Sequence, residues 1–144
     1  MESGFLLPDL DDEDAAPFWA GTARGELVVQ ACADCGQRRM PPRPMCFACR
    51  SLHHTWAPVS GRGRIWSFVV VHPPLLPAYS ALAPYNVVTV SLEEDDRLRL
   101  VGNLVARADG AINEVEPTTI RIGEPVRVVF TRVDDVVLPR WVRA

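Results

Sequence analysis

Hydrophobic and polar residues alternate along the second half of the chain, with the period of two that is typical of half-buried β-strands. The inward positions of three such segments are Val88, Val90 and Leu92, then Leu98, Leu100 and Leu104, then Val126, Val128 and Phe130. An earlier segment, RIWSFVVVH (64–72), is apolar on both faces, as expected for a strand in a curled sheet, and VVLPRWV (136–142) supplies a last strand. Five strands with a long first one predict a barrel of the OB type, because a β-sandwich usually needs about seven strands.

The N-terminal part of the chain has a helical pattern instead. The segment DDEDAAPFWAGTARGEL (11–27) predicts a short helix, with acidic residues near its start, where the helix dipole favours negative charge. Gly25 suits the position just past a helix C-terminus, and Phe18 and Trp19 would anchor the helix on an apolar surface. Residues 27–30 would form a first strand, and the turn-rich WAPVSGRG (56–63) marks a boundary. We expect three parts: a helix and first ribbon strand (1–31), a zinc ribbon (32–56) and an OB-fold domain (57–144).

All four cysteines of the chain fall within 18 residues, as two Cys-x-x-Cys pairs: Cys32 with Cys35, and Cys46 with Cys49. Two residues between thiols let one tight turn point both sulfurs at a single ion, and two such turns complete the tetrahedron that suits zinc. The spacing therefore predicts a four-thiolate site for zinc, although iron would satisfy the same ligands. Because protein fills all four corners, we expect the ion to be structural.

The residues around this cluster leave two interpretations open. His53 and His54 lie just beyond it, and an exposed pair in a connector is favoured over spare ligands because the tetrahedron is already complete. Four arginines surround the cysteines, at positions 38, 39, 43 and 50. They would either grip a phosphate or a partner, or balance the negative charge that four thiolates leave on a divalent ion.

The connection between the first two barrel strands, PPLLPAYSALAPY (73–85), is apolar and rich in proline, and too irregular for a helix or strand. In OB-folds this loop commonly forms part of the binding surface. We expect it either to fold back over the barrel mouth or to meet an apolar partner. The residues that would form this binding surface are Leu75, Leu76, Tyr79 and Leu82, with Arg62, Arg64 and His72 nearby.

Composition narrows the functional classes. The 144 residues carry a net charge of −3, and all 15 basic residues are arginine, which excludes a Schiff-base mechanism through a lysine of this chain. No apolar run approaches the roughly 20 residues of a membrane span, and the acidic start favours a cytoplasmic location. The cysteines are expected to bind the metal ion, and the sequence has no phosphate-binding glycine loop. His72 is the only histidine near the apolar loop. We therefore expect no catalytic residues.

Several segments together resemble a known family: PFWAGTARGELVVQACADCG, PPRPMCFAC, SFVVVH, APYNVVTVSLEE and IGEPVRVVF. The chain resembles acyl-CoA-associated proteins with an N-terminal zinc ribbon and a C-terminal OB-fold, long catalogued as a domain of unknown function. The resemblance covers about residues 17–141. It implies a mainly β protein, with an N-terminal helix and a rubredoxin-like zinc ribbon before a five-stranded OB barrel. It also implies that the chemistry resides in a partner subunit.

Two classes of function follow. The first is a non-catalytic accessory subunit that docks on a thiolase- or aldolase-like acyl-CoA enzyme, or on an acyl-CoA hydratase, in lipid or steroid side-chain degradation. The second is a nucleic-acid-binding module, since zinc ribbons and OB-folds both serve that role. The charge balance disfavours the second, because the barrel arginines stand among many acidic residues.

Overall fold

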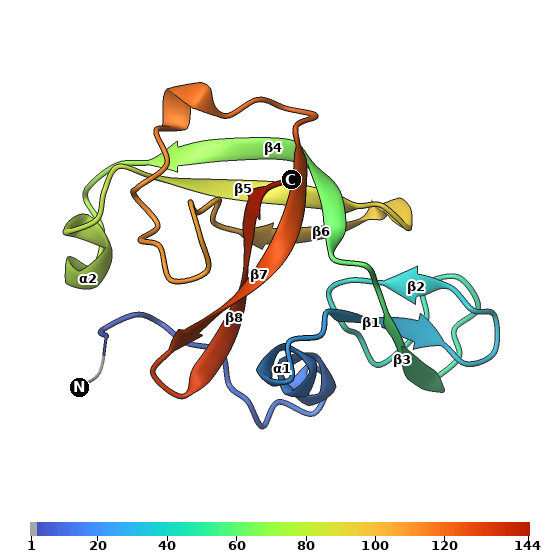
Figure 1. Cartoon of the computed structure of the whole chain (residues 1–144). Helices are drawn as coiled ribbons and strands as arrows, with labels where there is room; N and C mark the ends of the chain where they lie inside the picture. The colour runs from blue at the N-terminus through green and yellow to red at the C-terminus, as the bar shows by residue number, and fades with distance from the viewer. Residues whose placement is uncertain (1–2) are drawn as a thin grey trace.

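The protein is described by a computed structural model that covers residues 3–144, so the first two residues of the expected 1–31 segment lie outside it. The fold is mainly β, with a small ribbon at one end of a larger curled sheet (Figure 1). The elements in chain order are α1 Ala16–Ala23, β1 Val28–Cys32, β2 Arg38–Arg39, β3 His54–Pro58, β4 Arg62–Val71, α2 Pro77–Ser80, β5 Tyr85–Leu92, β6 Asp95–Gly102, the 3-10 helix η1 Pro117–Thr119, β7 Pro125–Val133 and β8 Val136–Arg143. None of the helices among residues 3–144 is long and apolar enough to cross a membrane.

Helix α1 ends at the predicted place, but it begins only at Ala16, so the expected acidic residues 11–14 precede the helix and none lies in its first turn. Proline occupies its first turn, where no backbone hydrogen bond is lost. At its other end Gly25 has a φ of +75° and donates to Thr22 O, while the Glu26 N–H reaches back to Gly21 O at 2.9 Å. This pair of bonds is a Schellman motif, which ends the helix and turns the chain into β1.

The strands form two antiparallel sheets. The three-stranded ribbon has the order β2-β1-β3, and the larger sheet has the order β6-β5-β4-β7-β8. Strand β4 pairs with β5 along most of its length and with β7 through its first residues, which allows the sheet to curl. The two edges meet where Leu104 bridges Trp141 and the Trp141 N–H donates to Asn103 O at 3.0 Å. This closure confirms the predicted five-stranded OB-type barrel.

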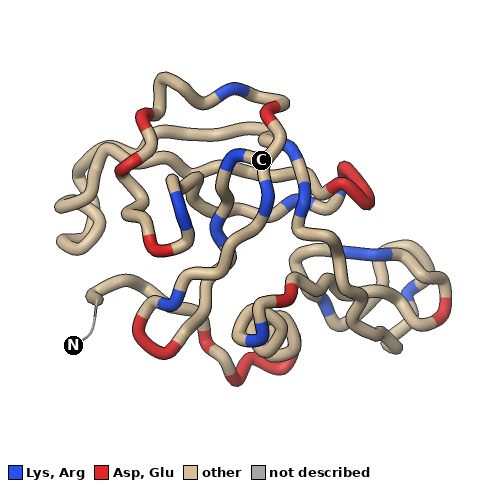
Figure 2. The backbone as a smooth tube through the Cα atoms, in the orientation of Figure 1, with Lys and Arg blue, Asp and Glu red and all other residues tan. Residues whose placement is uncertain are grey.

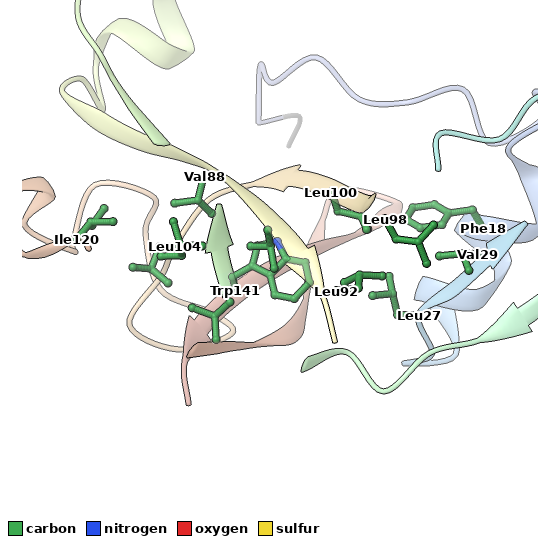
Figure 3. Close-up of a cluster of buried hydrophobic side chains, with 13 residues drawn as sticks. Phe18, Leu27, Val29, Val88, Leu92, Leu98, Leu100, Leu104, Ile120 and Trp141 are labelled. Carbon is green, nitrogen blue, oxygen red and sulfur yellow. The ribbon is translucent and has the colours of Figure 1, made fainter. Parts of the chain in front are cut away.

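One hydrophobic core cluster joins the helix, the ribbon and the barrel. Figure 3 shows it running from Ile120 past Trp141 to Phe18 and Val29. The predicted inward residues of β5 and β6 are buried in it, whereas Val128 and Phe130 of β7 pack against it only half-buried. The expected boundaries at residues 31 and 56 stay a prediction. The core is continuous across both positions, so the three expected parts pack together.

The connection 73–85 differs from its expected irregular form. It contains one helical turn, α2, and its last residue, Tyr85, begins β5. A proline at the first position of α2 pre-sets the helical φ, which explains why a proline-rich segment still forms a turn of helix.

Candidate functional site

Two similar turns hold the four cysteines. In the first, Gly36 donates to Cys32 O at 3.0 Å, and in the second Arg50 donates to Cys46 O at 2.9 Å. Both residues adopt a positive φ, +79° for Gly36 and +67° for Arg50. Gly36 has no Cβ and adopts this left-handed conformation without strain, whereas for Arg50, a residue with a Cβ, it costs about 1 kcal/mol or more.

The geometry of the sulfurs fits a tetrahedral metal ion. All four Sγ atoms lie within 4.8 Å of one another. The Cys32–Cys49 and Cys35–Cys46 Sγ pairs are 3.5 and 3.7 Å apart. A Zn–S distance of about 2.3 Å in a regular tetrahedron requires S···S edges of about 3.8 Å, so these edges need little adjustment.

The electrostatics of the cluster also call for a cation. The Cys35 N–H, 3.5 Å from Cys32 Sγ, lowers the pKa of the Cys32 thiol to about 6, and the Cys49 N–H likewise lowers the pKa of Cys46. The Ser51 N–H favours the Cys49 thiolate too, but the neighbouring cysteines outweigh it and raise the pKa of Cys49 to about 12. Four adjacent thiolates repel one another, and a bound divalent ion removes that penalty.

The residues around the cysteines have contacts of their own. Arg39 is 4% exposed, and its Nη2 donates to Arg43 O at 2.9 Å, so it packs inside the ribbon. His53 lies 3.5 Å from the Asp34 carboxylate, and His54 makes an edge contact with Trp56. Neither histidine belongs to the cysteine cluster, in agreement with the exposed-pair interpretation.

The apolar loop folds back on the barrel. Leu75, Tyr79 and Leu82 are half-buried against a second hydrophobic cluster made by Tyr85, Val105, Ile112 and Val142. The Tyr79 hydroxyl also accepts a hydrogen bond from the Leu6 N–H at 3.0 Å, and the Phe5 ring lies 5.0 Å from the Tyr79 ring. Of the four loop residues selected from the sequence, Leu76 alone is exposed, at 54%.

The structure does not bring the two selected arginines to this loop. Arg62 and Arg64 lie at the start of β4, whereas the loop follows the end of β4. At about 3.3 Å per residue, the two ends of this strand are roughly 30 Å apart. Arg62 Nε pairs with Glu93 at 2.8 Å, and Arg64 Nη1 donates to Gly123 O. His72 is exposed directly before the loop, and it lines a cleft together with Pro84 of the loop and Glu116. The sequence led us to expect both arginines near the loop, and it did not reveal this separation.

Three exposed apolar residues on the barrel were missed. Trp66 and Val69 of β4 and Val101 of β6 are 51%, 58% and 65% exposed. Arg99 lies 3.8 Å above the Trp66 ring. For Trp66 and Val69 the available signal was the apolar character of RIWSFVVVH on both faces, which we attributed from the sequence to a curled sheet. Figure 2 shows acidic and basic residues interspersed over the barrel strands and turns.

Comparison with known proteins gives two family models, which match consecutive parts of the chain. The model for the "ChsH2, rubredoxin-like zinc ribbon domain" matches residues 19–53, and the model for the "ChsH2, C-terminal OB-fold domain" matches residues 56–131. The ribbon model covers all four cysteines, so the match and the geometry agree on a metal-binding site.

The curated relatives include proteins that are much longer than this chain. The 3-oxo-4,17-pregnadiene-20-carboxyl-CoA hydratase alpha subunit of Mycobacterium tuberculosis is 34% identical over 98% of this chain, which spans 41% of that relative. A probable enoyl-CoA hydratase alpha subunit of Thermomonospora curvata is 36% identical over 81% of the chain, which spans 33% of it. A DUF35 domain-containing scaffold protein of Methanothermobacter thermautotrophicus is 33% identical over 76% of this chain and 75% of its own length.

Among solved structures, the Ltp2-ChsH2(DUF35) aldolase contains a chain that superposes with a TM-score of 0.80 and 32% identity. The match covers 94% of this chain and 98% of that one. A DUF35-family protein of unknown function from Sulfolobus solfataricus superposes with a TM-score of 0.61 at 12% identity, a likeness in fold alone.

Proposed function

Since the chain belongs to the DUF35 family of ChsH2-type proteins with a rubredoxin-like zinc ribbon and a C-terminal OB-fold, we propose that it is a non-catalytic accessory subunit of an acyl-CoA-processing complex. In this proposal it docks on a thiolase- or aldolase-like enzyme and supports the binding or turnover of acyl-CoA. The pathway would be lipid degradation, including that of steroid side chains.

The observation that carries the proposal is the similarity to the ChsH2(DUF35) chain of an aldolase complex. The match extends over nearly all of both chains, so it concerns the complete ribbon-and-barrel unit. The longer relatives named hydratase alpha subunits match over less than half of their length. Their similarity to this chain therefore supports a shared binding or scaffold module more than a shared active site.

The side chains support a non-catalytic role. The cysteines that would serve as nucleophiles are gathered in the metal site, and the chain has no lysine. His72 is exposed, and among residues 3–144 no hydrogen bond or ion pair orients it, whereas a general base needs a supporting group. Catalysis would then come from the partner's residues.

Zinc is the metal that we assign to the ribbon. Cys32, Cys35, Cys46 and Cys49 would hold it, and the sulfur spacing suits the Zn–S distance. With four protein ligands no position remains for water or substrate, so the ion would supply folding free energy and no catalysis.

We propose that the docking surface lies near the apolar loop, around the exposed Leu76 and the exposed Val69 of β4. Leu75, Tyr79 and Leu82 would support it from beneath, because they hold the loop against the barrel. His72 lies at the same end of β4. Arg62 and Arg64, at the other end, would contact acyl-CoA phosphates only if the ligand or the partner extends along β4.

The test is co-expression of the tagged chain with the thiolase-like subunit of its own organism, followed by size-exclusion chromatography with light scattering and assays with acyl-CoA thioesters. We expect one defined hetero-oligomer, and turnover that needs the partner. Leu76→Ser should weaken assembly, whereas the matched control Leu52→Ser, a leucine of the ribbon that is 64% exposed, should not. Turnover by the chain alone that is lost in His72→Ala would overturn the non-catalytic assignment.

A hydratase partner is the second candidate. The names of two relatives as hydratase alpha subunits favour it. Parallel co-expression with a hydratase-type subunit distinguishes the two, because only the cognate enzyme should form a stable complex and gain activity.

A further inference from the structure

A cleft opens where the helix, the ribbon and the barrel meet, at the seam that closes the barrel. It has a volume of about 440 Å3 and is lined by α1, by the ribbon segment at Met40 and Pro41, by β6 and the residue after it, and by β8. Ligand sites in proteins commonly have volumes of about 300–1,000 Å3 and occur between structural units. The size and place of this cleft therefore suit a small molecule.

One charged side chain of this cleft is buried. Arg140 of β8 is 8% exposed, and its Nε atom has no hydrogen-bond acceptor among the described residues. None of the ion pairs found between residues 3 and 144 involves it. Burial lowers the pKa of Arg140, but a guanidinium stays protonated at neutral pH. A buried charge without a partner is costly, so an anion in the cleft would relieve a real penalty.

The other lining residues fit an anion with an apolar body. The walls are largely apolar, with Phe18 and Trp19 on one side and Leu100 and Leu138 on the other, and they include no aspartate or glutamate. Arg99 also lines the cleft, but its guanidinium is stacked on Trp66. Asn103 is engaged too, since its Nδ2 donates to Asn86 O at 2.6 Å. Arg140 is thus the charged group left to receive a ligand.

We propose that this cleft binds a small apolar carboxylate, with the carboxylate paired to Arg140 and the hydrocarbon between the helix and the barrel. The free Nε allows a side-on, two-bond pairing of the kind that guanidinium and carboxylate groups form. Bulky dianions such as phosphate fit less well, because the walls offer few further donors. The site is separate from the metal centre and from the loop surface, and it does not depend on the accessory function.

The test compares octanoate with octanol, its uncharged counterpart, by equilibrium dialysis against the metal-loaded full chain. We expect one saturable octanoate site per chain, with an affinity at least about tenfold higher than that for octanol. Arg140→Met keeps an unbranched apolar stem without the charge, and it should remove that advantage. Arg132→Met, a matched control at an exposed arginine of the adjacent β7, should leave it unchanged.

A second variant keeps the proposal testable if Arg140→Met fails to fold. Leu138 lies two residues from Arg140 on β8 and so points to the same face. Leu138→Glu should supply an internal carboxylate, keep the melting temperature, and abolish octanoate binding. The proposal is overturned if the wild-type chain binds octanoate no better than octanol, or if a folded Arg140→Met or Leu138→Glu variant keeps the wild-type affinity for octanoate.

Discussion

The ribbon is expected to stabilise the whole chain through its metal ion, and Cys46→Ser tests this directly. Cys46 is fully buried, and its sulfur lies 3.7 Å from that of Cys35. A serine hydroxyl stays protonated near neutral pH and is a poor zinc ligand, so the variant should bind far less than one metal ion per chain. The ribbon sheet has a two-residue β2 and too few apolar residues to fold without the ion.

The size of the effect follows from the shared core. Leu27 lies directly before β1 and Val29 lies within it, and they are 3% and 0% exposed. Both belong to the cluster that contains Ile65 and Trp141 of the barrel. Burying an aliphatic side chain of this kind contributes about 1.5–3 kcal/mol, so releasing both removes up to about 3–6 kcal/mol. At an unfolding entropy of about 2.1 cal/mol/K per residue, that corresponds for a chain of this length to a fall in melting temperature of roughly 10–20 °C.

Elemental analysis measures the metal content of the variant, and amide hydrogen exchange measures the stability of its strands. Amides of β1 should lose their protection entirely, and those of β5 should keep theirs in reduced form. Phe47→Ser is the matched control, because Phe47 is adjacent to Cys46 but 66% exposed and offers no ligand. Loss of the metal with unchanged protection of β1 would refute the structural role, and a wild-type chain that contains no metal and two disulfides would refute the site itself.

Three further predictions concern the ribbon turns and the loop. Gly36→Ala should destabilise the metal-bound chain by about 1 kcal/mol, because Gly36 has a φ of +79°. Arg50→Gly should relieve the same strain, because Arg50 has a φ of +67°. Denaturant unfolding that shows no loss of stability in Gly36→Ala would contradict this. Asp34 accepts a hydrogen bond from the Ser51 hydroxyl and lies near His53, and these contacts lower the pKa of its carboxyl group. Its contribution is therefore present above the unfolded-state pKa of about 4 and lost as pH falls through the folded value, so melting curves of Asp34→Asn should be less sensitive to acid than those of the wild type. Tyr79→Ala should lower the free energy of unfolding by about 2 kcal/mol, because Tyr79 packs on the second cluster. Leu76→Ser should change it by no more than about 0.5 kcal/mol, because Leu76 is exposed. Equal losses in thermal unfolding would refute the assignment of Tyr79 as support and of Leu76 as surface.

The strands and the metal ligands were predictable because each depends on local pattern. Val88, Val90 and Leu92 alternate in sequence and are all buried, since the side-chain period of a strand is two. The cysteine pairs were equally readable, because two residues between thiols fix one turn whatever surrounds it. Gly25 has the positive φ that its place just past the helix predicted.

What could not be predicted depends on contacts between distant segments. The loop was open to two interpretations because the partner of Tyr79, the backbone of Leu6, is 73 residues away in sequence. Arg140 reads as an ordinary strand arginine, and only the packing of α1 beside β8 makes it a buried charge. The exposure of Trp66 arises at an irregularity in the pairing of β4 with β5, which periodicity does not show.

The arrangement also limits how the metal can affect a partner. The ribbon and α2 lie at opposite ends of the molecule (Figure 1), so the metal centre cannot touch a partner docked at Leu76 unless that partner spans the barrel. Coupling between the two ends would pass from the cluster that Val29 and Ile65 share to the second cluster, which lies beneath the loop. Metal loss should therefore weaken docking only in proportion to the fraction of barrel that unfolds, whereas Leu76→Ser should weaken it in a chain that is fully folded. Docking that fails without metal while β5 keeps full protection would instead place the ribbon itself in the interface.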